Sequence, residues 1–227
     1  MDEGELDMLK PPILITGCAR SGTSMTAGVL KKCGAWSGNV FGPNKWNRKG
    51  MYENVEIREN VIKLYLTLLG VDPKGQNPLP DINKLLPLSN LRVRIETIIK
   101  YQGYLNETWF YKGAKMCLIW PVLHDAFPDA KWIIVRRKDE SIIHSCMRTA
   151  FMNGYENEVG WQSWIDTHKQ RFKEMKDNGL NVIEVWPSKF VYGDYSEIIS
   201  VVESFGLKWD EGAVKDFVSP ELYGGDK

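Results

Sequence analysis

A Gly/Ser-rich segment with a single arginine, Gly17-Cys-Ala-Arg-Ser-Gly-Thr-Ser24, has the residue types and the spacing to hold an anion. Gly17 and Gly22 permit the backbone angles and the close approach that a tight turn needs. Such a turn directs backbone N–H groups inward, and a helix that follows it adds partial positive charge at its N-terminus. Thr23 and Ser24 add hydroxyl donors. The segment therefore predicts a phosphate-binding loop.

This loop lacks the lysine that ATP-binding loops carry. In the pattern GxxxxGK[ST] the lysine would stand at position 23, where this chain has Thr23, and it would reach the β- and γ-phosphates beside Mg²⁺. The only cation in the loop is Arg20, whose guanidinium suits a single 5′-phosphate or a sulfonate held by two hydrogen bonds. A P-loop kinase or other nucleotide phosphotransferase stays open as an alternative, as does a nucleotide-binding protein without catalytic activity.

The loop, Gly-x-x-Arg-Ser-Gly-Thr-Ser after an apolar stretch, resembles the 5′-phosphosulfate-binding loop of the sulfotransferases, and bacterial members often have arginine at this place. The donor of that family is 3′-phosphoadenosine 5′-phosphosulfate (PAPS), which leaves as adenosine 3′,5′-bisphosphate. The resemblance implies a PAPS-dependent sulfotransferase that transfers a sulfonate to a hydroxyl or amine of a small-molecule or carbohydrate acceptor. It implies no metal requirement.

A second basic segment resembles the 3′-phosphate motif of the same family, an arginine at a strand end with a serine eight residues later. Arg137 and Ser145 match that spacing, and Arg136 is kept as a neighbour. The family often has Asp-Pro after the arginine, where this chain has Lys138-Asp139. A solvated basic cluster is the other interpretation. The residues expected to hold the donor are Gly17, Arg20, Ser21, Gly22, Thr23, Ser24, Arg137 and Ser145.

Shorter stretches extend the resemblance to about residues 12–218 with less specific motifs. Lys49-Gly-Met-Tyr-Glu-Asn54 is similar to a segment of many bacterial sulfotransferases, as is Lys112-Gly-Ala-Lys-Met-Cys-Leu118, although Gly-Ala replaces the family's Asp-Pro. Phe205-Gly-Leu-Lys-Trp209 is similar to the stretch that closes these domains.

Three residues are expected to take part in the chemistry. Arg20 and Lys112, or Lys115 in place of Lys112, would stabilise charge on the leaving bisphosphate. The resemblance implies that Glu53 is the base that removes the proton of the acceptor, although it could instead complement the dipole of a following helix. Glu53→Gln is expected to abolish turnover and to leave bisphosphate binding intact.

Other side chains could contribute to the site, but ordinary packing explains them equally well. None of the three histidines stands in the Lys-Thr-His context of the animal cytosolic enzymes, and only His144, beside Ser145, could border the 3′-phosphate. Five aromatic residues could form walls of an acceptor pocket. They are Trp36, Trp46, Tyr52, Trp161 and Trp164.

The elements that must position these residues alternate between strand and helix. Short strands are predicted at 12–16, 108–111, 131–135 and 181–185, the first with the continuous apolar character of a buried parallel strand. Helices are predicted at 23–32, 57–70, 90–105, 118–127, 139–152, 159–177 and 195–205, with irregular segments at 36–52 and 71–88. This order predicts an α/β fold, a three-layer sandwich with a central parallel sheet like that of the P-loop nucleoside-triphosphate hydrolases.

Composition limits the class of protein. The 227 residues predict a single domain, 1–227, in which 1–10 form a flexible N-terminal segment. Lysine plus arginine equal aspartate plus glutamate at 29 each, which argues against a nucleic-acid partner. No apolar run approaches the ~20 residues of a membrane span, and the start lacks the features of a signal peptide. Four scattered cysteines indicate reduced thiols and a cytoplasmic protein rather than a zinc site.

Overall fold

A four-stranded parallel sheet forms the centre of the computed structural model, which describes residues 9–224. The strands are β1 (Ile13–Gly17), β2 (Phe110–Lys112), β3 (Lys131–Val135) and β4 (Val182–Val185), in the spatial order β2-β1-β3-β4. After β1 the chain thus adds β2 on one side of β1 and then β3 on its other side. Ligands of open parallel sheets bind outside the carboxyl ends of the strands at such a switch point, so the β1–β3 edge is where a site is expected.

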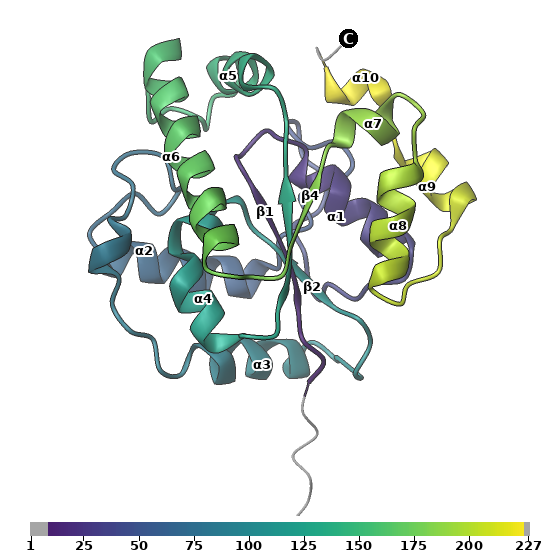
Figure 1. Ribbon diagram of the computed structural model, residues 1–227, viewed down its shortest axis with the longest axis horizontal. Helices are drawn as coiled ribbons and strands as arrows, with labels where there is room; N and C mark the ends of the chain where they lie inside the picture. The colour runs from purple at the N-terminus through teal and green to yellow at the C-terminus, as the bar shows by residue number, and fades with distance from the viewer. Residues whose placement is uncertain (1–8, 225–227) are drawn as a thin grey trace, which may run out of the picture.

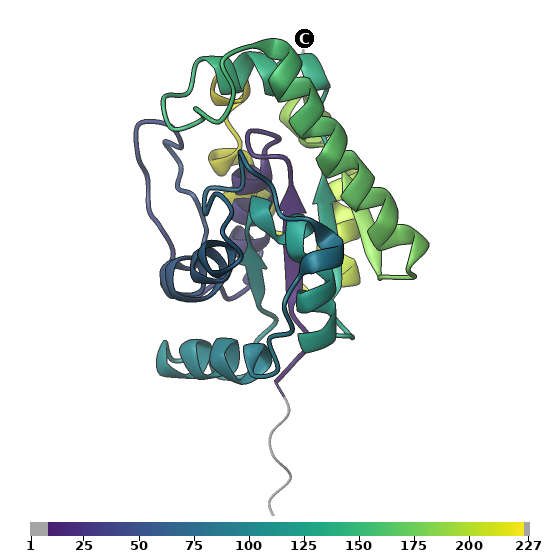
Figure 2. The ribbon, with the colours of Figure 1, turned by 90° about the vertical axis from the view of Figure 1, so that its left-hand side faces the viewer.

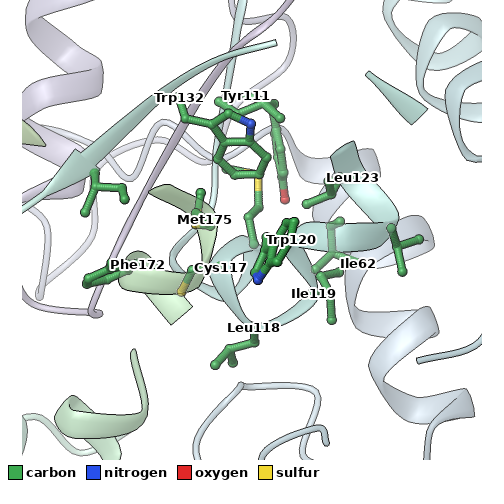
Figure 3. Packing of buried hydrophobic residues seen from close by; sticks show 14 of the residues in the cluster. Ile62, Tyr111, Cys117, Leu118, Ile119, Trp120, Leu123, Trp132, Phe172 and Met175 are labelled. Carbon is green, nitrogen blue, oxygen red and sulfur yellow. The ribbon is translucent and has the colours of Figure 1, made fainter. Parts of the chain in front are cut away.

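Side chains of the strands alternate between two apolar cores, one on each face of the sheet. Leu14, Trp132 and Ile134 belong to one core, and their neighbours along the strands belong to the other. The first core has Trp132 and Tyr111 packed beside Met175 and above Trp120 (Figure 3). Because both faces are covered, β1 and β3 are mostly apolar rather than alternating, whereas β4, at the edge of the sheet, has Glu184 among its apolar residues.

Helices cover each face and complete the three layers, which confirms the predicted fold class (Figure 1). One face carries α1 (Thr23–Lys32), α7 (Pro187–Val191), α8 (Ser196–Ser204), α9 (Glu211–Phe217) and α10 (Pro220–Tyr223). The other carries the π-helix η1 (Ile57–Lys63), α2 (Leu64–Leu68), α3 (Leu91–Tyr101), the 3₁₀-helix η3 (Ala114–Ile119), α4 (Trp120–Ala126), α5 (Asp139–Met147) and α6 (Glu158–Asp177). A short 3₁₀-helix, η2 (Ile82–Lys84), interrupts the segment 71–88.

The helix predicted at 57–70 forms, but the residues that it buries differ from the prediction. The apolar spacing predicts one buried face made of Ile57, Val61, Leu64, Tyr65 and Leu68. Three of the five are buried, but Leu64 and Leu68 are 43% and 67% exposed, and Ile62 and Leu66 are buried in their place. The physical reason is the π-helical turn at 57–63, which takes more residues per turn than an α-helix and so rotates the following residues around the axis. A periodicity of 3.6 residues could not anticipate that rotation.

Helix ends were predicted less well than helix positions. The helix that begins at residue 139 ends at Met147 rather than at 152, and three short helices after residue 186 were missed. Proline stands at the first turn of α7 and of α10, where its lack of an N–H is tolerated. Residues 1–8, on which most of the predicted flexible segment falls, lie outside the described residues.

All four cysteines are free and buried. Cys117 lies in the core shown in Figure 3, and burial raises the pKa of its thiol to about 12. These thiols therefore pack as small apolar groups. Within residues 9–224, none of the helices has the length and apolar character required to cross a bilayer.

Candidate active site

A cavity of about 880 Å³ opens at the carboxyl edge of the sheet, where the chain leaves β1 and β3. Its walls come from the loop after β1, the segments 44–51 and 148–152, the end of β2, and the C-terminal residues 219–224. The segment 36–52 lies beside the connection between α5 and α6 (Figure 2), and residues of both segments line the cavity. The edge-to-face pair of Trp46 and Phe151, with ring centroids 6.1 Å apart, joins these two segments.

The loop after β1 has the backbone that its glycines require. A Cβ added at Gly17 would lie 2.5 Å from the Val135 carbonyl oxygen, so no other residue fits between β1 and β3 here. Gly22, at φ 100°, precedes α1 in the left-handed region. Arg20 also takes a positive φ, 73°, which is uncommon for a residue with a side chain and often marks a functional position. The N-terminus of α1 has no side-chain cap.

Arg20, Ser145 and Arg137 connect the two predicted anion sites. Arg20 Nε donates to Ser145 Oγ at 2.9 Å, and Arg137 Nη1 donates to the Arg20 carbonyl oxygen at 2.9 Å. Burial lowers the pKa of Arg20, and the positive charges of Arg137 and Arg148 lower it further. The loop after β1, the end of β3 and the last turn of α5 therefore meet in one positive corner, which we call the donor corner and define by Arg20, Arg137 and Ser145.

Arg137 also contacts the C-terminal segment. Its Nη2 donates to the carbonyl oxygen of Tyr223 at 2.7 Å and to that of Gly224, and its guanidinium lies 4.3 Å from the centroid of the Tyr223 ring. Arg136 takes a different direction and donates to Glu184 at 3.2 Å, outside the cavity lining. Of the two adjacent arginines, Arg137 is thus the one that reaches the cavity.

A second cluster of charges, which we call the Glu53 cluster, lies deeper in the cavity. Lys112 Nζ, at the end of β2, donates to Glu53 Oε1 at 3.0 Å, and Arg58 Nε forms an ion pair with Glu53 Oε2 at 2.8 Å. Glu53 and Lys112 are both buried, with relative exposures of 4%. The buried carboxylate therefore has two cationic partners, as burial of a charge requires.

The charges around Glu53 decide its protonation state. Burial on its own would raise the pKa of Glu53, but the surrounding cations outweigh that effect and lower it from 4.5 to about 2. Those cations are Lys112, Lys115 and Arg58. Glu53 is consequently an ionised and weakly basic carboxylate in the absence of a ligand.

Lys115 differs from Lys112 although both are buried lysines in the cavity wall. The ammonium group of Lys115 makes no hydrogen bond and no ion pair with any of residues 9–224. Burial lowers its pKa, an effect that the Glu53 carboxylate opposes. Lys115 is therefore the buried cation whose charge the fold leaves least compensated.

Most of the predicted site residues meet in this cavity. Arg20, Gly22, Thr23, Ser24, Glu53, Lys112, Arg137 and Ser145 all line it. Gly17 and Ser21 do not line it. Gly17 is the last residue of β1, and the Ser21 side chain is fully buried. Ser24 Oγ donates to the Met51 carbonyl oxygen at 3.2 Å, which ties the phosphate loop to segment 44–51.

The histidines and most of the aromatic candidates lie elsewhere. None of the three histidines lines the cavity, and His168 is buried with its pKa lowered to about 4 by that burial. Trp161 and Trp164 are core residues, and Trp36 lines a separate shallow depression of about 360 Å³. Of the five aromatic candidates, Trp46 alone lines the large cavity.

The sequence interpretation missed several basic residues that line the cavity. They are Lys45, Arg48, Arg58, Lys63, Lys74 and Arg148. The composition of the segment 44–49, with three cations and no acid, was a usable signal for part of this set. Arg58, Lys63, Lys74 and Arg148 reach the cavity from four different places in the chain, which only the fold brings together.

Part of the chain matches a known protein family. The family described as "Sulfotransferase domain" matches residues 106–198, a range that contains Lys112, Arg137 and Ser145 but not the loop at 17–24. The family that this match supports is the sulfotransferases. No curated protein sequence matches the chain.

Two solved bacterial sulfotransferases have a similar fold. The sulfotransferase domain of the olefin synthase of Synechococcus PCC 7002 is 16% identical at a TM-score of 0.60, over 98% of this chain and 82% of that one. Sulfotransferase STF1 of Mycobacterium tuberculosis H37Rv is 15% identical at a TM-score of 0.50, over 93% of this chain and 72% of that one. At these identities the likeness concerns the fold, and it extends beyond the family match to include the loop after β1.

Proposed function

We propose that the protein is a sulfotransferase that uses PAPS as donor and a hydroxyl or amine of a small-molecule or carbohydrate as acceptor. The observation that carries the proposal is the donor corner, where Arg20 donates to Ser145 and Arg137 donates to the Arg20 carbonyl oxygen. Two anion-binding elements from β1 and β3 are thereby joined at one edge of the sheet. A donor with anionic groups at both its 5′ and 3′ positions suits such a pair.

Each part of the donor is assigned to one element. The 5′-phosphosulfate takes the N–H groups at the start of α1, the hydroxyls of Thr23 and Ser24, and Arg20. The 3′-phosphate takes Arg137 and Ser145. Arg137 Nη2 donates to two carbonyl oxygens of the C-terminal segment, and these oxygens would compete with the phosphate for the same guanidinium.

The reaction forms a bond from the acceptor oxygen or nitrogen to sulfur while the bond from sulfur to the bridging phosphate oxygen breaks. The electron pair of the broken bond leaves with the bisphosphate, and the proton of the acceptor passes to a base. Cations aimed at the leaving oxygen stabilise the charge that develops there. Arg20 and Lys112 are proposed for this part, and Glu53 for the base.

Glu53 and Lys112 act together in this proposal. As long as Lys112 donates to Glu53, the pKa of Glu53 is about 2, too low for an efficient base. An ammonium group that turns from Glu53 toward the leaving oxygen would stabilise that oxygen and raise the pKa of Glu53 in one movement. Proton removal would then be coupled to departure of the bisphosphate.

Calorimetric titration with adenosine 3′,5′-bisphosphate, without Mg²⁺, tests the donor assignment. We expect micromolar binding of the bisphosphate and much weaker binding of AMP, because AMP lacks the 3′-phosphate. A preference for ATP with Mg²⁺ would contradict the proposal and favour a nucleotide phosphotransferase. If the bisphosphate binds but neither sulfonyl transfer nor donor hydrolysis is detected, a non-catalytic binding protein replaces the enzyme.

A further inference from the structure

The cavity concentrates positive charge in a chain whose formal net charge is zero. Eleven lysine and arginine residues line it, against two carboxylates, Glu53 and Glu221. PAPS brings about four negative charges, so the donor leaves most of this excess uncompensated. The surplus requires a partner other than the donor.

The cations of the lining differ in whether a carboxylate of the protein already compensates their charge. Arg58, Lys63 and Lys112 have carboxylate partners at 2.8 to 3.0 Å, so their charges are already compensated. Six other cations of the lining form no ion pair with a carboxylate of residues 9–224. They are Lys45, Arg48, Lys49, Lys74, Lys115 and Arg148.

The contacts that four of these six make are with neutral groups. Lys45 lies over the Trp46 ring at 4.9 Å, and Lys74 Nζ donates to Asn153 Oδ1 at 3.0 Å. Lys49 and Arg148 donate to backbone carbonyl oxygens, at 3.2 and 3.3 Å. A cation bonded to a neutral oxygen or a ring keeps its charge for a ligand.

Lys115 makes the strongest case for an anionic ligand. It is only 8% exposed, it lines the cavity, and its ammonium group makes no hydrogen bond with the described residues. Its nitrogen is not among the fully buried polar atoms that lack a hydrogen bond, so it keeps contact with the cavity, where an anionic ligand could pair with it. Trp46 and Phe151 add an aromatic wall beside these cations, suitable for the face of a sugar or another ring.

From these observations, and resting on the proposed sulfotransferase function, we propose that the acceptor is itself an anion. It is a hydroxyl or amine compound that carries a carboxylate or phosphate group. The aromatic pair holds its ring, and the cations of segment 44–49, with Lys74, Lys115 and Arg148, hold its charge. Neutral acceptors of the same shape are disfavoured, because they leave these cations without a partner.

Three matched probes test the acceptor class on protein first saturated with adenosine 3′,5′-bisphosphate. They are 4-nitrophenyl β-glucoside, its 6-carboxylate counterpart the glucuronide, and its 6-phosphate. We expect at least one charged probe to bind about tenfold more tightly than the glucoside, as one charge-assisted contact in a partly dry site gives. The two charged probes distinguish a carboxylate from a phosphate.

Two variants and a control link the preference to the named cations. Lys45→Gln with Arg48→Gln should reduce the preference for the charged probe by about three- to tenfold and leave the glucoside unaffected. Lys115→Met should reduce the same preference by a similar factor. Lys32→Gln with Lys100→Gln removes the same charge from exposed positions outside the cavity, and it should change nothing.

Each outcome decides one proposal. Equal affinity for charged and neutral probes, including binding of none, overturns the anionic acceptor but leaves the donor assignment standing if the bisphosphate still binds. If the variants weaken bisphosphate binding and keep the preference for charged probes, these cations bind the donor rather than the acceptor. That result also overturns the anionic acceptor. Failure of the bisphosphate to bind overturns the proposed function itself.

Discussion

The donor corner and the Glu53 cluster hold their cations in opposite ways. In the donor corner Arg20 donates to a serine hydroxyl and Arg137 donates to backbone carbonyl oxygens. In the Glu53 cluster Lys112 and Arg58 meet a carboxylate that is nearly as buried as Lys112 itself. Burial and the positive charges of Arg137 and Arg148 lower the pKa of Arg20, whereas the cations of the Glu53 cluster lower the pKa of their carboxylate.

This difference indicates how each region responds to an anion. The donor corner gains attraction as soon as a phosphate enters, because Arg20 forms no ion pair with a carboxylate of residues 9–224. The Glu53 cluster gains little attraction for an anion unless Lys112 leaves the Glu53 carboxylate and pairs with the incoming anion instead. Binding of the bisphosphate is therefore expected to depend on the donor corner, and variants of Glu53 should lower turnover while leaving that binding intact.

Glu53→Gln should have the largest effect. Loss of a general base lowers kcat by roughly 10²–10⁴-fold, while binding of the bisphosphate should stay within about twofold. Glu59→Gln is the matched control, since Glu59 also pairs with Arg58, at 3.0 Å, but does not line the cavity. If Glu53→Gln keeps its turnover, the base lies elsewhere and the proposed exchange by Lys112 loses its purpose.

Arg20→Ala should weaken bisphosphate binding by roughly 1.5–4 kcal/mol, because it removes a charge-assisted contact from a partly dry site. Arg137→Ala should act in the same range. Arg136→Ala serves as control, because that guanidinium donates to Glu184 outside the cavity. Calorimetry with the bisphosphate measures all three. An equal loss in the control would mean that general positive charge, and not the donor corner, holds the nucleotide.

The pKa of Glu53 also predicts a pH dependence of stability. Its folded value, about 2, lies below the ordinary 4.5, so the ion pairs stabilise the fold fully above pH 4.5 and lose their effect as the pH falls toward 2. The difference in unfolding free energy between wild type and Glu53→Gln should shrink by up to about 3 kcal/mol across that window. Urea denaturation at several pH values measures it. A difference that does not vary with pH would show that Glu53 is not held ionised.

The sequence predicted the donor corner better than the Glu53 cluster, and the reason is physical. The loop at 17–24 and the pair Arg136-Arg137 each follow an apolar strand directly, so local pattern and the parallel sheet suffice to place them. The contact between Glu53 and Lys112 joins residues 59 positions apart, and its effect on the pKa depends on burial. No spacing rule carries that information.

Other details depend on tertiary structure in the same way. The direction of the Ser21 side chain, fully buried rather than facing the cavity, follows from a backbone that no composition predicts. The π-helical turn at 57–63 shifted the buried face of its helix. The contact of Arg137 with Tyr223, 86 residues later, could not be foreseen, because the short helix α10 has no strong periodic signal of its own.

Tyr223→Ala should have the smallest effect on bisphosphate affinity, and it tests whether the C-terminal segment competes with the donor for Arg137. The ring lies 4.3 Å from the Arg137 guanidinium, and contacts of this kind contribute about 0.5–2 kcal/mol. Loss of this ring contact should weaken the hydrogen bonds from Arg137 to the C-terminal carbonyl oxygens. Bisphosphate affinity should then rise by a few-fold, because the phosphate and these carbonyl oxygens compete for the same guanidinium. Leu222→Ala, in the same helix, controls for loss of packing. A drop in bisphosphate affinity that Tyr223→Ala shows and Leu222→Ala does not would contradict this competition. It would mean that the C-terminal segment is part of the donor site and that Arg137 binds the phosphate while it still contacts that segment.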